Sequence, residues 1–265
     1  MDLSNMLKEI DDLKAKLDAA PAFSEGELKR LREHFMVDFT YNSNAIEGST
    51  LTLRETALVV LEGLTINKKP LKDHFDAVGH KEAFDYVVDL SKNNHELSER
   101  TIKEIHSLVL MGEPTDRGRY REVSVQITGA NDIPPHPIEV PLKMDNLLNE
   151  YKNDSRHPII KIADFHIKFE RIHPFVDGNG RTGRLVLNLE LLIAGYAPIN
   201  IKFKDRESYL DCFKHYEETG DHSKFVEMVS RYELEELRTI YSLALEKVAT
   251  QEFYQKRSSY AGRNH

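Results

Sequence analysis

The chain has 265 residues, 30% of them charged and 40% hydrophobic, which is the composition of an ordinary globular protein. Its formal net charge of −8 argues against nucleic acid as an obligatory partner, because phosphate backbones bind basic surfaces. The single cysteine, Cys212, excludes an internal disulfide, and no apolar run approaches the length of a membrane span. Since the N-terminus lacks the features of a signal peptide, we expect a cytoplasmic protein with no membrane partner.

The N-terminal residues predict two helices. Residues 3–17 place apolar side chains at helical spacing, and this stripe needs a covering surface, either the rest of the chain or a second copy in a homodimer. Ser24 and Glu27 have the spacing of a capping box and begin the second helix, which we expect to end near Gly48.

The end of that second helix contains a candidate functional residue, Glu47. A carboxylate in the last helical turn lies at the negative end of the helix dipole, which is unfavourable by up to about 1 kcal/mol. Glu47 would therefore gain from a nearby cation, and Ser43, four residues earlier, lies on the same face. The alternative is an ordinary exposed glutamate before a helix-ending glycine, Gly48.

The middle of the chain continues as helices, at about 52–63, 73–90 and 98–111, with Thr52 and Ser98 as N-caps. The histidines of this region have no spacing that other metal ligands support, so surface or satisfied-core positions are expected for them. They are His74, His80, His95 and His106.

Residues 112–141 differ from the rest because glycines and prolines interrupt any helix there. Alternating side chains near 123–127 and 137–140 predict a small hairpin. The expected fold class is therefore mainly α with one small β-hairpin, and an ordinary surface loop is the alternative for the hairpin.

The second half of the chain predicts further helices, and within them His166 and Cys212 are expected to be core residues. These helices are expected at about 142–151, 158–172, 185–194, 205–216 and 223–255.

The stretch from His173 to Arg184 (HPFVDGNGRTGR) holds most of the residues that can carry chemistry. A glycine-rich turn leading into a helix exposes backbone N–H groups, and the helix dipole favours an anion there. Asp177 can hold a divalent cation beside that anion, and the guanidiniums of Arg181 and Arg184 match phosphate geometry. His173 is suited to accept a proton near neutral pH. We interpret the stretch as a polyphosphate site with a metal ligand and a general base.

This stretch resembles the signature of the Fic family, His-x-Phe-x-Asp/Glu-Gly-Asn-Gly-Arg-x-x-Arg. Every fixed position is matched, by His173, Phe175, Asp177, Gly178, Asn179, Gly180, Arg181 and Arg184. The residues Ser43, Glu47 and Gly48 are similar to the Ser/Thr-x-x-x-Glu-Gly/Asn pattern of the class with an N-terminal inhibitory helix. The resemblance implies a Fic-type helical bundle in which the hairpin is a flap that holds a target segment by strand addition.

The activity that the resemblance implies is transfer of AMP from ATP to a Ser, Thr or Tyr hydroxyl of a target protein, which can be the chain itself. His173 would be the base, Asp177 would hold Mg²⁺ (or Mn²⁺), and Glu47 would pair with Arg184 and block the productive nucleotide pose. The nucleotide-binding residues would be Gly178, Asn179 and Gly180 through their backbone, Arg181 and Arg184 through their guanidiniums, and Tyr209 at the adenine.

Three regions follow from this interpretation: residues 1–70 carrying the inhibitory helix, a catalytic core at 71–222, and a C-terminal helical region at 223–265. Two other functions stay open. Glu47 could position water for removal of AMP from a modified protein, or the chain could bind nucleotide without catalysis, although the intact His173 argues against the latter.

Overall fold

The computed structural model describes residues 2–93, 95–126 and 133–261, with side chains as far as residue 248. This part of the chain is helical, which confirms the mainly α fold class. Its elements are α1 Leu3–Asp18, α2 Glu25–Ile46, α3 Leu53–Glu62, α4 Leu71–Lys92, α5 Glu99–Val109, the 3₁₀ helix η1 Pro137–Glu139, α6 Val140–Asn153, α7 Pro158–Ile172, α8 Asn179–Ile193, the 3₁₀ helix η2 Phe203–Asp205, α9 Arg206–Thr219 and α10 Ser223–Ala261.

Local capping determines where several of these helices begin. Ser24 accepts a hydrogen bond from the Glu27 backbone while the Glu27 carboxylate accepts from the Ser24 backbone, so the predicted capping box of α2 is confirmed. Thr52 and Glu55 form the same arrangement at α3. Ser98 caps α5 through the backbone N–H of Thr101.

The predicted hairpin is wrong for the residues that the structure describes. Residues 123–126 form no strand, and residue 127 lies outside the described part of the chain. Residues 137–139 form η1, which leads directly into α6 at Val140. The reason is local: Pro137 occupies the first helical turn, where its missing N–H costs nothing and its fixed φ suits a helix.

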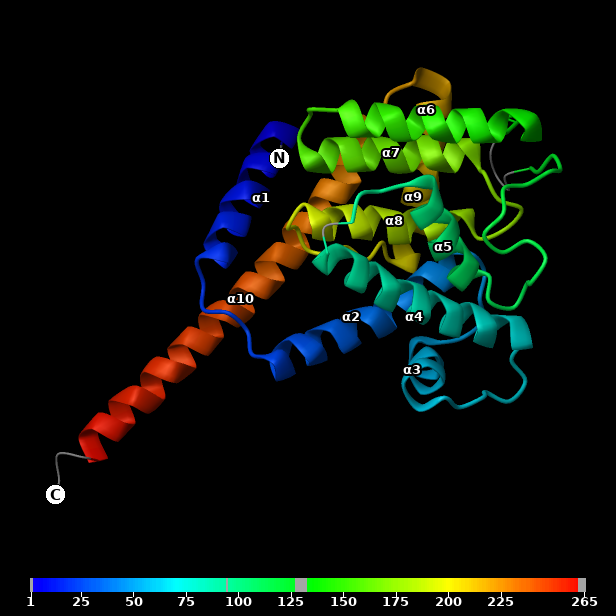
Figure 1. Cartoon of the computed structure of the whole chain (residues 1–265). Coiled ribbons are helices and arrows are strands. Elements are labelled where there is room, and N and C mark those ends of the chain that lie inside the picture. Colours follow the sequence, from blue (N-terminus) through cyan, green and yellow to red (C-terminus); the bar gives the residue numbers. More distant parts are fainter. Residues whose placement is uncertain (1, 94, 127–132, 262–265) are drawn as a thin grey trace.

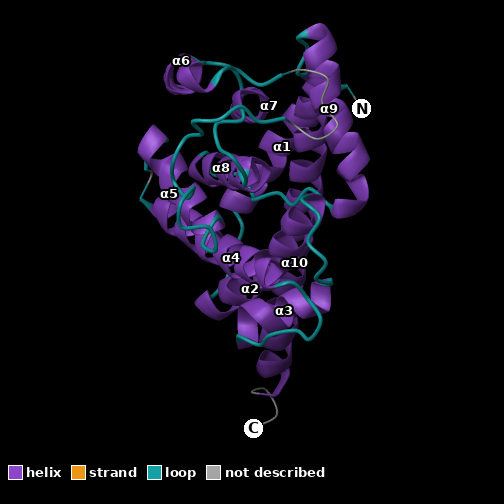
Figure 2. Cartoon of the chain, turned by 90° about the vertical axis from the view of Figure 1, so that its right-hand side faces the viewer, coloured by secondary structure: helices purple, strands orange, loops and turns teal. Residues whose placement is uncertain are grey.

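Helix α8 is the centre of the fold, and α2, α4, α5 and α7 pack around it. Most of α8 is buried, from Asn179 through Leu191, including both arginines of its first turns. Figure 1 shows α6, α7 and α8 stacked one below another, with α4 beneath them, and Figure 2 shows α8 end-on within this arrangement. The predicted polyphosphate site therefore lies at the N-terminus of a largely buried helix.

The apolar stripe of α1 packs against α10, and in Figure 1 the two helices lie side by side at the edge of the molecule. Ile10 and Leu13 are buried there, so the chain itself covers this part of the stripe. No helix in the described residues is long and apolar enough to cross a bilayer.

Candidate active site

His173 stands at the end of α7 in a left-handed backbone conformation, with φ of 49° and ψ of 60°. A non-glycine residue seldom adopts this conformation, which ends the helix. The imidazole lines a cavity of about 240 Å³, to which α2, α7, α8 and α9 contribute residues, among them Glu47, Gly180, Arg184 and Tyr209. Burial lowers the pKa of His173, so the ring stays neutral down to a lower pH than an ordinary histidine. A neutral ring can accept a proton.

The loop that follows His173 is held through its own backbone. The side chain of Asn179 donates to the Phe175 carbonyl and accepts from the Phe175 N–H, both at 2.9 Å. His106 lies stacked on the Phe175 ring, with centroids 3.6 Å apart. The amide side chain of Asn179 thus closes the loop, a role that its place in the glycine-rich pattern does not indicate.

His106 fixes the position of Asp177. Its Nδ1 accepts from the Gly118 N–H at 2.9 Å, so Nε2 must donate to the Asp177 carbonyl, also at 2.9 Å. Burial lowers the pKa of His106 to about 4, which keeps this arrangement neutral at physiological pH. His106 is therefore a buried histidine with both ring nitrogens hydrogen-bonded, one of the two positions expected for it. Its hydrogen bond to the Asp177 backbone also connects it to the candidate site.

The N-terminus of α8 comes next, with Gly178 as a left-handed N-cap (φ 78°) and Gly180 in the first turn. A Cβ on Gly180 would overlap the Glu47 carboxylate, so no larger residue fits there while Glu47 is in place. The backbone N–H groups of this turn and the Glu47 carboxylate therefore lie at the same end of the helix.

Arg181 is buried and paired with acids. Its Nη1 lies 2.6 Å from Asp76 Oδ1 and its Nη2 lies 3.2 Å from Asp177 Oδ1. Lys72 approaches the same two carboxylates, at 2.8 Å from Asp76 and 3.5 Å from Asp177. Asp76, on α4, is a site residue that sequence reasoning missed, because its partner is distant along the chain.

Arg184 is also buried, and it donates hydrogen bonds to Ser43 in the last turns of α2 and to Glu47, the C-cap residue of that helix. Nη2 donates to Glu47 Oε1 at 2.7 Å and to the Ser43 carbonyl at 2.8 Å, while Nε donates to Ser43 Oγ at 3.0 Å. Gly48 follows with φ of 95°, the left-handed position that ends the helix beside this pair. Ser43 and Glu47 are thus brought to the second arginine of the glycine-rich stretch.

Tyr209 lies behind Arg184, with its ring centroid 5.7 Å from the guanidinium carbon. Its hydroxyl lies 2.8 Å from His166 Nε2. Burial lowers the pKa of His166 to about 3 and raises that of Tyr209, so the tyrosine O–H donates to a neutral imidazole. His166 is a core residue, as predicted.

Glu170 and Gly183 complete the surroundings of Arg184, and no sequence pattern indicates that they do. A Cβ on Gly183 would overlap Glu170 Oε1, which is buried and has no hydrogen-bond partner among the described residues. Burial raises the pKa of Glu170 to about 8, with the nearby Arg184 acting in the opposite direction. Glu170 was overlooked because α7 was read only for its apolar face.

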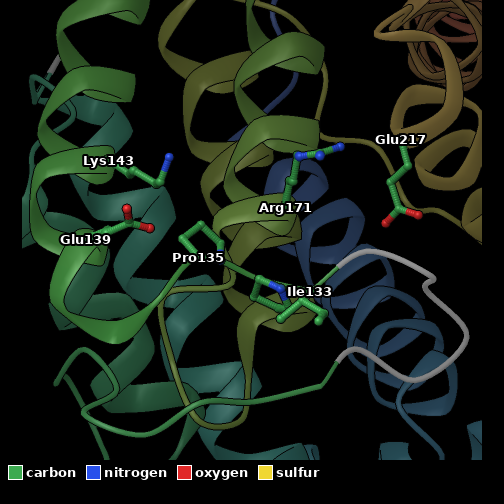
Figure 3. Close-up of a pocket in the computed structure, with 7 residues that line it drawn as sticks. Ile133, Pro135, Glu139, Lys143, Arg171 and Glu217 are labelled. Atoms are coloured by element: carbon green, nitrogen blue, oxygen red, sulfur yellow. The ribbon is translucent and has the colours of Figure 1, made fainter.

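A second cavity, of about 250 Å³, adjoins the first, and Figure 3 shows its residues. Arg171 from α7 and Glu217 from α9 line both cavities. The remaining lining residues come from the connection between α5 and α6 and from α6 with its preceding turn; they are Ile133, Pro134, Pro135, Glu139 and Lys143.

One half-exposed carboxylate, that of Asp177, is available here to bind a divalent cation. Among the described residues, no group of three or more His, Cys, Asp or Glu could hold a metal ion. Asp177 Oδ2 instead faces outward beside Lys72, and half of this side chain is exposed. A single carboxylate fits Mg²⁺, which usually keeps several waters and shares its remaining ligands with phosphate oxygens.

Comparison with known proteins agrees with this geometry. Residues 96–191 match the family model Fic/DOC family. The chain is 35% identical over 232 residues to the protein adenylyltransferase Fic of Nematostella vectensis, covering 85% of this chain and 53% of the relative. The chain spans about half the length of the curated relatives it matches.

Two solved structures have a similar fold. A Fic domain containing signaling protein from Bacteroides thetaiotaomicron superposes with a TM-score of 0.83 at 26% identity, over 90% of this chain and 98% of that one. Fic-1 from C. elegans (residues 134–508) gives a TM-score of 0.80 at 28% identity, over 94% and 73% of the two chains. The chain therefore belongs to the Fic/DOC family, and it is homologous to Fic protein adenylyltransferases.

Proposed function

We propose that this protein is an adenylyltransferase that moves AMP from ATP to a hydroxyl side chain of a protein. The observation that supports this most is that the neutral imidazole of His173 and the buried guanidinium of Arg184 line one cavity at the N-terminus of α8. Curated relatives over most of this chain carry the name protein adenylyltransferase Fic.

The proposed reaction uses His173 as the base. Its imidazole takes the proton of the attacking hydroxyl, whose oxygen forms a bond to the α-phosphorus while the bond from that phosphorus to the bridging oxygen of the β-phosphate breaks. The products are the AMP-modified protein and pyrophosphate. Arg181 and Arg184 would bind the leaving phosphates, and the N–H groups of Asn179 and Gly180 would bind the oxygens that gain charge. The Gly178 N–H already donates to Asp177 Oδ1, so it would contribute through the shape of the turn.

Asp177 would hold Mg²⁺, with Mn²⁺ as an alternative ion. When bound, the ion neutralises phosphate charge and orients the phosphate chain. Within this protein, His106 fixes the Asp177 carbonyl and the Gly178 N–H donates to Asp177 Oδ1 at 2.6 Å, so the carboxylate direction is set by the chain.

We further propose that Glu47 inhibits the isolated protein. Its carboxylate occupies Arg184 at 2.7 Å, where a terminal phosphate of ATP would otherwise bind. Because a carboxylate and a triphosphate repel each other, nucleotide can bind productively only when Glu47 leaves Arg184. Tyr209, behind the same guanidinium, stays our candidate for the adenine end of the site.

Removal of AMP from a modified protein is the second candidate activity. The observation that favours it is that the Glu47 carboxylate shares one cavity with the His173 imidazole, so it could orient a water. Incubation of AMP-modified target with the wild type and with Glu47→Gly separates the two, because removal of AMP would need Glu47 and addition would not.

The direct test uses Glu47→Gly protein and ATP labelled either at the α- or at the γ-phosphorus. The proposal predicts protein-bound label from the α-labelled ATP only, and none from the γ-labelled ATP. Label from γ would indicate a kinase, and no label from either with a cell lysate as acceptor would contradict transferase activity. Mass spectrometry of the labelled lysate would then identify target and residue, and UTP in place of ATP would test the donor.

The division into regions 1–70, 71–222 and 223–265 and the cytoplasmic location stay predictions. The boundary at residue 70 puts Glu47, the C-cap residue of α2, and Arg184, on α8, in different regions. The proposed inhibition would therefore act between two regions.

A further inference from the structure

We propose that Arg121 is a positioning residue for the catalytic imidazole: it holds the backbone of His173 in place and ties it to two points, Val123 and Pro135, of the connection between α5 and α6. The inference rests on the proposed AMP transfer for one of its readouts, and a second readout is independent of activity.

The first part of the argument concerns the catalytic turn. Arg121 is only 2% exposed. Its Nε donates to the His173 carbonyl at 2.8 Å, and its Nη2 reaches the Ile172 carbonyl at 3.4 Å. The backbone N–H of Arg121 donates to the Pro174 carbonyl at 2.9 Å. Three successive carbonyls around the catalytic histidine therefore depend on this one residue.

The other side of the guanidinium binds the connection between α5 and α6. Nη1 donates to the Val123 carbonyl at 3.2 Å and Nη2 to the Pro135 carbonyl at 2.6 Å. All four side-chain acceptors are backbone carbonyls, and no carboxylate in the described part of the chain pairs with Arg121. Only a planar fork with several donors can serve four acceptors at once, and lysine cannot replace it fully.

The need for this bond follows from the backbone of His173. A left-handed conformation at a non-glycine residue costs on the order of 1 kcal/mol and persists only when its surroundings hold it. Loss of the Nε donor would leave the His173 carbonyl without its partner, and the turn that aims the imidazole would lose its fixed geometry. The Asp177 end of the loop has separate supports, His106 and Asn179, so nucleotide binding need not change.

The charge of Arg121 gives a second consequence. Burial lowers the pKa of His173, Arg121 lowers it further, and the carboxylates of Glu47 and Asp177 act in the opposite direction. Removal of the Arg121 charge should therefore raise the pKa of His173, whereas lysine should leave it nearly unchanged.

The experiment compares Arg121→Gln and Arg121→Lys, both in the Glu47→Gly background, with Arg156→Gln as control. Arg156 binds acids near the opposite end of α7, so its loss tests the effect of removing a structural arginine there. The readouts are the saturated rate of AMP incorporation, the Kd of Mg·AMPPNP by calorimetry, and the His173 titration by NMR on protein labelled at histidine Cε1, with the signal assigned from His173→Ala.

We expect Arg121→Gln to lower the saturated rate by about tenfold or more with a Kd within about twofold of the parent, because displacement of a catalytic group acts on the chemical step. The His173 titration should move to higher pH. Arg121→Lys should recover part of the rate and the parent titration, and Arg156→Gln should change neither.

An unchanged rate together with an unchanged His173 titration in Arg121→Gln would overturn the inference, as would equal losses in Arg121→Gln and Arg156→Gln. If Arg121→Gln does not fold, Arg121→Lys decides: a parent-like rate would overturn the inference and a partial loss at constant Kd would support it. If the Glu47→Gly parent itself transfers no AMP, the proposed function fails, and the NMR titration still tests the position of His173.

Discussion

The two ends of the stretch from His173 to Arg184 are stabilised in opposite ways. The His173 end is held by hydrogen bonds to its backbone carbonyls, from Arg121, His106 and Asn179, and the His173 imidazole lines the cavity. The Arg184 end is held through its side chains, because acids of the same protein occupy both guanidiniums.

This difference separates the groups that are already in position for ATP from the ion pair that must open before ATP can bind. Backbone bonds at the first end need not break for ATP to bind, so the proposed base, His173, and the proposed metal ligand, Asp177, are organised in advance. At the second end the Glu47–Arg184 pair must open, because a phosphate and a carboxylate would compete for one guanidinium. The proposed regulation would therefore act on nucleotide binding, and the proposed chemical groups would stay in place.

The largest effect is expected at the first end. In the Glu47→Gly background, His173→Ala should lower AMP incorporation by about 10²-fold or more, because the general base is lost while the phosphate site is intact. Labelled ATP and gel analysis measure the rate, and calorimetry should show an unchanged Kd for Mg·ATP. A His173→Ala protein that still transfers AMP at the parent rate would remove the base from this account.

Opening the second end should raise activity. Glu47→Gly should increase AMP incorporation by about tenfold or more over wild type, since loss of one charged hydrogen bond of about 1.4 kcal/mol changes an equilibrium tenfold.

The chain offers a matched control for this prediction. Glu62 is the last residue of α3 and precedes the left-handed Gly63, as Glu47 precedes the left-handed Gly48, but it lies in no described ion pair. Glu62→Gly should leave the rate unchanged. Equal activation by both substitutions would show that a loosened helix end, not the pair with Arg184, causes the effect.

A smaller activation is expected from Ser43→Ala. The substitution removes the Oγ acceptor of Arg184 Nε but keeps Glu47, and one buried hydrogen bond of about 1 kcal/mol corresponds to a severalfold increase in rate. Ser230→Ala, which removes another buried serine hydroxyl on α10, is the control. If Ser43→Ala activates more than Glu47→Gly, then Ser43, and not Glu47, is the main restraint on Arg184.

A separate prediction concerns stability and pH instead of the rate of AMP transfer. The pKa of Glu170 rises to about 8 in the folded protein from an ordinary value of 4.5, so the folded state holds a proton that the unfolded state releases between these values. The free energy of unfolding should therefore fall as pH rises from about 4.5 to about 8.

Urea unfolding of wild type and Glu170→Gln at pH 5 and pH 8 measures this contribution. The difference between the two proteins isolates Glu170 from Glu233, another buried acid whose pKa is raised. The free energy of unfolding of Glu170→Gln minus that of the wild type should be larger at pH 8 than at pH 5. A parallel pH dependence in both proteins would show that Glu170 is ionised in the folded state.

The sequence predicted those features that depend on neighbouring residues. The capping box at Ser24, the N-cap at Thr52, the span of α7, and the turn from His173 to Arg184 are all encoded within a few positions. The predicted hairpin was wrong because its second strand was inferred from only three alternating residues after Pro137. These were too few to outweigh the preference of that proline for a helical first turn.

The residues that sequence reasoning missed act across long separations. Asp76 meets Arg181, and Arg121 meets His173, over distances in the chain that no local pattern encodes. The contact of Glu47 with Arg184 was predicted only because the resemblance supplied it, since 137 positions separate the two. Side chains that bind backbone, such as His106 and Arg121, are the hardest to predict because any residue can offer a carbonyl.

The central claim is that the turn entering α8 binds a magnesium-bound triphosphate once Glu47 has left Arg184. Calorimetry of Mg·ATP with the His173→Ala/Glu47→Gly protein tests it without turnover, against His173→Ala alone. We predict saturable heat with a Kd about tenfold or more below that of the single variant. No heat from the double variant at millimolar nucleotide, or equal affinity in both proteins, would contradict the account.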